Sequence, residues 1–125
     1  MNELPNSELE IMMIIWSYRD TVTRSEVEEK LIKKGRRLDE TSILTYLSRL
    51  QKRGFLKVEK KGKKNFYTPL ITEEEYMQKE SKRILKQMFH SSLKNFVCAL
   101  YDGKEVDEKD KEELLRYIDY KRKKE

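Results

Sequence analysis

Residues 38–69 hold the feature that most constrains the fold of this chain, which is a short helix followed by a hairpin with a lysine-rich tip. The first part, LDETSILTYLSRLQKRG, starts with a helix-capping Asp39 and stops at Gly54. The second part, FLKVEKKGKKNFYTP, has two β-prone runs around a polar turn that contains glycine, so it predicts a two-stranded hairpin. A helix that fits a groove, beside a basic hairpin that can contact phosphates, is typical of nucleic-acid binding.

Two further helices are predicted before this unit. The first has Asn6 or Ser7 as its N-cap, and its expected apolar face consists of Leu9, Met12, Met13 and Trp16, widened by Ile11 and Ile15. The second opens with capping-box spacing at 23–26, stops at Gly35, and is expected to turn Val27, Leu31 and Ile32 inward. The order helix, helix, helix, hairpin predicts a winged helix-turn-helix DNA-binding domain over residues 1–70.

Residues 71–125 are predicted to form a helical dimerisation domain, so the fold class is mainly α with a small β-hairpin wing. A capping box at 72–75 opens a long helix, Ser91 or Ser92 starts a second, Asp107 caps a third, and the tail 121–125 is expected to fray. Their apolar stripes are too few to close a core alone, which indicates burial against a second subunit. The expected dimerisation residues are Ile84, Leu85, Met88, Phe89, Leu93, Phe96, Val97, Leu100, Leu114, Leu115 and Ile118. The alternative is that these helices fold back on the first domain.

Charge is concentrated where the helix and hairpin are predicted. The chain has a formal net charge of +5, and residues 1–70 have 15 Lys and Arg against 10 Asp and Glu. Residues 71–125 have 13 of each, whereas residues 36–64 have 10 basic against 3 acidic side chains. A basic excess on one supersecondary unit indicates a polyanionic partner.

The helix that follows Asp39 has two distinct faces. At about 100° per residue, Ile43, Leu47 and Leu50 point inward with Tyr46 at their margin. The opposite face presents the candidate DNA contacts Thr41, Thr45, Ser48 and Lys52, flanked by Leu44 and Arg49. Short hydroxyl side chains fit the major groove, and the cations reach phosphates or a guanine. The alternative is an ordinary amphipathic helix with a solvated polar face.

The hairpin tip adds Lys60, Lys61, Lys63 and Lys64 as candidate phosphate contacts. Lysine ammonium groups contact phosphate as point charges and do not distinguish one base sequence from another.

The residue inventory argues against an enzyme. His90 and Cys98 are the only histidine and the only cysteine, and they lie eight positions apart. His90 is expected just past a helix end, at the surface, and Cys98 is expected as a small core residue. The sequence indicates no cofactor, no metal site, no disulfide, no secretion signal and no membrane span, and we expect a cytoplasmic protein.

The chain resembles the penicillinase-repressor family, which includes BlaI, MecI and the copper-responsive CopY branch. The matching segments are SELEIMMIIW, TSILTYLSRLQKRGFL, NFYTPLI and KEELLRYI. The resemblance implies a homodimeric transcriptional repressor that binds double-stranded DNA at an inverted-repeat operator. It implies DNA contacts at Thr41, Ser42, Thr45, Ser48 and Arg49 and on the wing. Leu44 departs from the Arg or Gln frequent in these repressors, which puts their operator sequence in doubt here.

Regulation differs between the branches of this family. The resemblance implies a regulatory protease as a partner of the antibiotic-responsive members, which are cut at an Asn-Phe bond in the dimerisation helices. This chain contains Asn95-Phe96, but alignment with the family places the scissile pair near Ala99-Leu100, so we interpret Asn95-Phe96 as a chance core dipeptide. The copper branch has several C-terminal cysteines, whereas this chain has Cys98 alone.

Two other functions stay open at the level of sequence. A winged helix that binds protein would need an apolar patch on the third helix, where the sequence offers only Leu44. A ligand-responsive regulator would need a pocket, for which the candidate lining is Tyr76, Met77, Met88, Phe89 and Tyr101.

Overall fold

The structure, a computed structural model, describes residues 3–103 and 106–125. The elements are α1 (Asn6–Trp16), α2 (Arg24–Lys33), α3 (Glu40–Lys52), β1 (Leu56–Lys61), β2 (Lys64–Pro69), α4 (Glu73–Phe89), α5 (Leu93–Asp102) and α6 (Glu108–Lys124). This order confirms the predicted fold class of helices with one small antiparallel hairpin. The chain forms two compact units, one up to Glu80 and one from Ser81, so α4 contributes to both.

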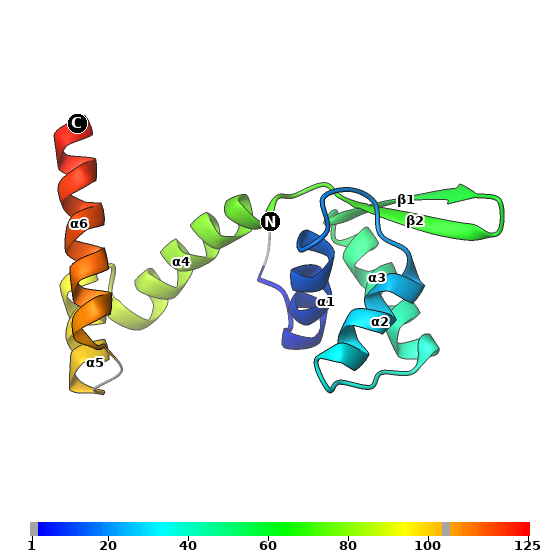
Figure 1. Cartoon of the computed structure of the whole chain (residues 1–125), viewed down its shortest axis with the longest axis horizontal. Helices are drawn as coiled ribbons and strands as arrows, with labels where there is room; N and C mark the ends of the chain where they lie inside the picture. The colour runs from blue at the N-terminus through cyan, green and yellow to red at the C-terminus, as the bar shows by residue number, and fades with distance from the viewer. Residues whose placement is uncertain (1–2, 104–105) are drawn as a thin grey trace. The chain divides into compact units, whose positions relative to one another are not determined.

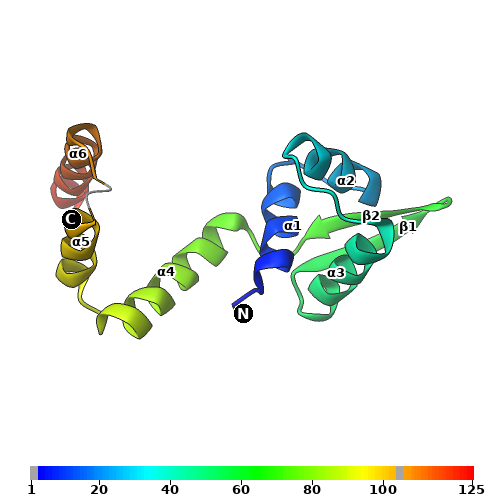
Figure 2. The same ribbon diagram turned by 90° about the horizontal axis from the view of Figure 1, so that it is seen from below.

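The core of the first unit lies among α1, α2, α3 and the base of the hairpin (Figures 1 and 2). The fully enclosed side chains come from all of these elements, and they include Ile11, Ile15, Val27, Leu31, Ile43, Leu47, Leu50, Phe55 and Leu56. The expected inward face of α3 is therefore confirmed. Beyond this base the two strands run outward together as a wing (Figure 1).

Local signals fix both ends of α3. The carboxylate of Asp39 accepts a hydrogen bond of 2.7 Å from the backbone N–H of Ser42, which caps the first turn. At the other end Gly54 has a φ of +84°, and the N–H of Phe55 donates to the carbonyl of Leu50 at 2.9 Å. A left-handed glycine followed by this bond is a Schellman motif, in which the chain turns sharply off the helix. The predicted cap and stop are both confirmed.

The base of the wing is held by a bridge that sequence patterning missed. Val22, in the segment between α1 and α2, exchanges backbone hydrogen bonds of 2.9 and 2.8 Å with Tyr67 of β2. Both residues are buried. A single β-bridge leaves no periodic pattern in the sequence, so it could not be predicted. It connects the wing to the segment just before α2.

Several predictions for the first two helices are wrong in detail. Helix α1 starts at Asn6 with Pro5 at the N-cap position, without a side-chain cap. Its buried arc is centred on Glu8, Ile11 and Ile15, so Met13 lies on the far side and is 37% exposed. In α2 the inward stripe is Val27 and Leu31, and Ile32, one residue further round the helix, is 50% exposed.

Tyr76 belongs to the core of the first unit and not to the predicted ligand pocket. Its ring lies 5.7 Å from the ring centroids of both Trp16 and Phe55, and its hydroxyl accepts a 2.9 Å hydrogen bond from the backbone N–H of Leu4. Trp16 donates its indole N–H to the carbonyl of Ile71 at 2.8 Å. The first turn of α4 is thus packed against the rest of the first unit. It begins with the predicted capping bond, in which the Glu75 N–H donates to the Thr72 hydroxyl.

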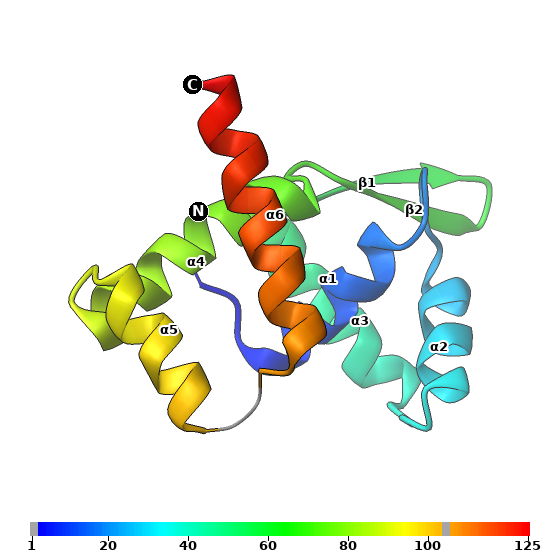
Figure 3. The ribbon, with the colours of Figure 1, turned by 60° about the vertical axis from the view of Figure 1, so that its left-hand side comes forward.

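In the second unit, α5 and α6 follow α4 as separate helices (Figure 3). Ser92 caps α5 by accepting from the Asn95 N–H at 3.1 Å, and Asp107 caps α6 by accepting from the Asp110 N–H at 2.8 Å. Cys98 is exposed, which corrects its assignment to a core.

Helix α6 continues to Lys124, so the expected fraying is also wrong. Basic residues stabilise the end of a helix through its dipole, and Lys123 pairs with Asp119 at 3.4 Å.

Candidate nucleic-acid interface

The outward face of α3 forms a shallow hollow whose lining matches the predicted contact face. The lining side chains are Thr41, Leu44, Thr45, Ser48, Arg49 and Lys52, all of them exposed. Because the opposite face of the helix is enclosed, the helix presents these side chains together on its exposed side. Thr45 donates its hydroxyl to the carbonyl of Thr41 at 2.9 Å, so its oxygen can still accept a hydrogen bond from another group.

One predicted residue, Ser42, lies outside this lining, and another, Arg49, is held within it by an aromatic neighbour. Ser42 is half-buried, and its backbone N–H is used by the Asp39 cap, so it lies beside the hollow and not in its lining. Arg49 lies in the lining, with its guanidinium carbon 5.9 Å from the ring centroid of Tyr46. A cation over an aromatic face is held in place while it stays accessible to an anion.

The wing brings the four predicted lysines together at its tip. Lys61 pairs in register with Lys64, and Lys60 with Asn65, around a turn in which Gly62 has a φ of +65°. All four lysines are exposed.

Nearer the base of the wing, Lys57 and Glu59 form an ion pair of 2.8 Å. The hydrogen bond between them raises the pKa of Lys57 and lowers that of Glu59. The one carboxylate on the hairpin is therefore matched by a cation of its own, and the tip keeps a concentrated positive charge.

A second hollow lies beside the first, and sequence reasoning missed most of it. Its lining is Thr23, Arg24, Ser25, Glu40, Leu44, Lys63, Lys64, Asn65 and Tyr67, so it lies between the start of α2, the start of α3 and the wing. Leu44 lines both hollows. The capping box at Thr23 located the start of α2, but no local pattern could show that this turn faces the wing.

Comparison with known proteins agrees with this arrangement. Residues 4–120 match the sequence model of the penicillinase repressor family. The chain belongs to the penicillinase repressor family. This is a family of repressors and not of enzymes.

Individual relatives of this penicillinase-repressor chain are distant but cover most of it. The Bacillus licheniformis penicillinase repressor is 28% identical over 94% of this chain and 90% of the relative. An uncharacterised 16.5 kDa protein of Latilactobacillus sakei is 30% identical over 87% of this chain and 73% of the relative. The solution structure of the DNA binding domain of the repressor BlaI is similar with a TM-score of 0.52 and 35% identity, over 59% of this chain and 88% of that domain.

Proposed function

We propose that this protein is a transcriptional repressor that binds double-stranded operator DNA in a sequence-specific manner. The observation that supports it most directly is the hollow on α3, which brings together exposed hydroxyls and cations on the unit that also contains the lysine-tipped wing. In this proposal α3 lies in the major groove, where Thr45 and Ser48 contact base edges and Arg49 and Lys52 contact phosphates or a guanine. The wing lysines contact the adjacent backbone. Family membership and the likeness to the BlaI DNA binding domain support the same function.

We further propose that the repressor acts as a homodimer through residues 71–125. Eight of the eleven predicted dimerisation side chains are exposed in the single chain, from 36% for Ile84 and Phe96 to 67% for Met88. The other three, Leu85, Phe89 and Val97, are half-buried. So much exposed apolar surface is unusual for a monomer and indicates a partner surface. A symmetric dimer would place two α3 helices about 34 Å apart on an inverted repeat.

The dimer proposal has a direct test on the full chain. Light scattering should give twice the chain mass for the wild type, and Leu115→Glu should shift the mass toward one chain while circular dichroism keeps its helical content. Leu70→Glu is a matched control, because Leu70 is 57% exposed, against 66% for Leu115, but precedes the helices concerned. A wild type that stays monomeric at all accessible concentrations would contradict the dimer.

We also propose that the protein acts in the cytoplasm and that an antibiotic releases repression. Both parts of the proposal rest on family membership. A regulatory protease would then cut within the second unit. Asn95 and Phe96 lie inside α5, and the centroid of the Phe96 ring is 5.3 Å from that of Phe89. Both residues are exposed, so the expectation of a core dipeptide is wrong for the single chain. Mass spectrometry of the repressor from cells grown with and without a β-lactam would locate any cut, and an intact chain would contradict this part.

A protein-binding winged helix is less well supported. Leu44, 40% exposed, is the one apolar side chain in the lining of the α3 hollow, which leaves no apolar patch there for a partner protein.

The deciding experiment selects duplexes from a random pool with the purified full chain and measures affinity at about 50 and 200 mM salt. We expect an enriched inverted repeat and a log–log salt slope of about −0.9 for each phosphate contacted. Weak binding without an enriched motif would contradict the function.

A further inference from the structure

The hollow between α2, α3 and the wing has the charge pattern of an anion site. Its lining contains three cations, Arg24, Lys63 and Lys64, and one carboxylate, Glu40. These cations come from two elements far apart in the sequence, the start of α2 and the wing. Leu44 lines this hollow and also the hollow on the front of α3, so the two adjoin at this side chain.

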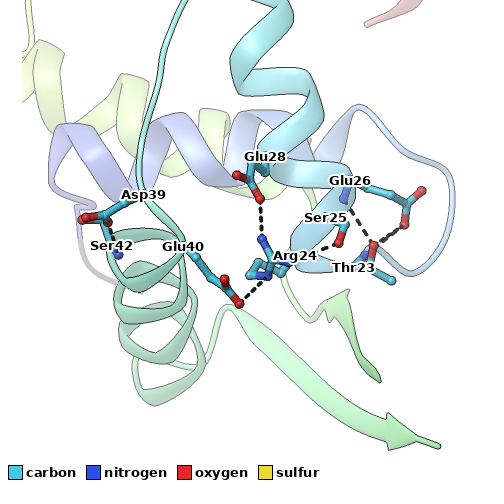
Figure 4. Close-up of polar contacts among 8 residues, drawn as sticks. All are labelled: Thr23, Arg24, Ser25, Glu26, Glu28, Asp39, Glu40 and Ser42. Atoms are coloured by element: carbon cyan, nitrogen blue, oxygen red, sulfur yellow. Dashed lines mark hydrogen bonds and ion pairs between the residues drawn. The ribbon is translucent and has the colours of Figure 1, made fainter. Parts of the chain in front are cut away.

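Arg24 is restrained within this hollow by two carboxylates (Figure 4). One guanidinium nitrogen is ion-paired with Glu28, on its own helix. The Nε atom lies 3.5 Å from the carboxylate of Glu40, the first residue of α3. The remaining nitrogen donates to the hydroxyl of Ser25 at 3.3 Å. The side chain of Arg24 is 25% exposed, so its position is set by packing and by these partners.

The contact with Glu40 is the weaker of the two ion pairs. It is the longer one, and the Glu40 side chain is 65% exposed, against 36% for Glu28. An exposed ion pair of this length contributes little stability and exchanges readily for another anion. A phosphate offers the guanidinium a more highly charged and bidentate acceptor.

We propose that this hollow binds one phosphate of the DNA backbone, with Arg24 as the main contact and Glu40 as its competitor within the protein. On binding, the phosphate takes the place of the Glu40 carboxylate beside Arg24, while Glu28 keeps the guanidinium aimed into the hollow. Lys63 and Lys64 supply the opposite wall. Glu40 thereby weakens binding to every sequence alike, because it opposes a backbone contact and no base. The inference rests on the proposed DNA-binding function.

The test compares charge-removing variants of the full chain on an operator duplex and a scrambled duplex. Arg24→Gln should weaken binding to both by a similar factor and reduce the magnitude of the salt slope by about 0.9 for each chain bound. Glu40→Gln should strengthen binding to both several-fold, although it also removes an ion pair. Arg24→Lys keeps the cation and should retain the salt slope.

Glu29→Gln is the matched control for net charge. Glu29 is an exposed carboxylate on the same helix, paired with Lys33 at 3.9 Å, and it does not line the hollow. If Glu29→Gln strengthens binding as much as Glu40→Gln, the effect belongs to overall charge and the proposal is overturned.

The two variants should change DNA affinity in opposite directions if Arg24 contacts a phosphate, but in the same direction if the ion pair is only a structural link between α2 and α3. If the ion pair only held the helices together, Arg24→Gln and Glu40→Gln would both lower the unfolding midpoint and both weaken binding, which would overturn the proposal. Should Arg24→Gln fail to fold, Glu40→Gln against Glu29→Gln decides the question. A wild type without operator preference would refute the proposed function itself, whereas a specific wild type with unresponsive variants would refute this inference alone.

Discussion

The carboxylate of Glu8, in the first turn of α1, accepts a 2.7 Å hydrogen bond from Nε of Arg53, the residue that follows α3. Glu8 is only 2% exposed, whereas the Arg53 side chain is 39% exposed. A buried carboxylate needs a partner of this kind because burial removes its hydration. The pair therefore joins the start of the first helix to the end of the proposed recognition helix.

We predict that Arg53→Met lowers the free energy of unfolding by about 1–3 kcal/mol, since it leaves the Glu8 carboxylate buried without its cation. Urea denaturation of the full chain measures this loss. Removing both charges, as in Glu8→Met with Arg53→Met, should recover part of it. A single Arg53→Met variant as stable as the wild type would show that water satisfies Glu8.

Tyr76→Phe should also destabilise the protein, by about 1–3 kcal/mol, because the buried N–H of Leu4 loses its acceptor while the ring stays in place. Denaturation gives the size of the effect, and faster amide hydrogen exchange at Leu4 identifies its origin. Tyr117→Phe serves as the control, since Tyr117 is 58% exposed. Equal effects of the two changes would contradict a role for this hydrogen bond.

The cap of α3 should depend on pH in a defined direction. Hydrogen bonds from the Ser42 side chain and backbone N–H lower the pKa of Asp39 below its ordinary value of 3.8. Because the folded-state pKa is the lower one, this stabilisation is present above the unfolded pKa and is lost as the pH falls through the folded value. Asp39→Asn, which caps without a charge, should lose less stability than the wild type between about pH 6 and pH 3. Identical losses would contradict the lowered pKa.

Substitutions on α3 and on the wing should differ in kind. Ser48→Ala should change which base sequence is preferred, since Ser48 lines the hollow that we propose to face the major groove. Lys63→Ala should weaken all sequences by the same factor and reduce the salt slope, because a lysine contacts the backbone. Selection from a random pool, repeated with each variant, distinguishes them. A changed motif with Lys63→Ala would show that the wing takes part in base recognition.

The features of the fold that depend on residues close together in the sequence were predictable. The limits of α3 were predictable because Asp39 and Gly54 act on their nearest neighbours. The outward face of α3 followed from helical periodicity, and it supplied the lining of the first hollow.

What the sequence did not reveal depends on partners far away in the chain. Glu8 looks like an ordinary first-turn acid until Arg53, 45 positions later, is placed beside it. From the sequence alone, Arg24 looks like a solvated residue after a helix cap. The fold places Glu40 and the wing beside it. Exposure of Cys98 and of the α5 and α6 stripes is likewise a property of the packed chain and not of any local pattern.

The wing differs from the rest of the first unit in how it is stabilised. Val58 and Tyr67 pair at its base against the core, whereas every residue from Glu59 to Asn65 is exposed. A segment with little apolar burial opens locally at low free energy, without unfolding of its neighbours. We therefore expect the tip to open and reclose while α3 remains folded. In the proposed complex, the wing would therefore be the first part of the chain to release the phosphate backbone. Dissociation from DNA would begin as local unfolding of the hairpin.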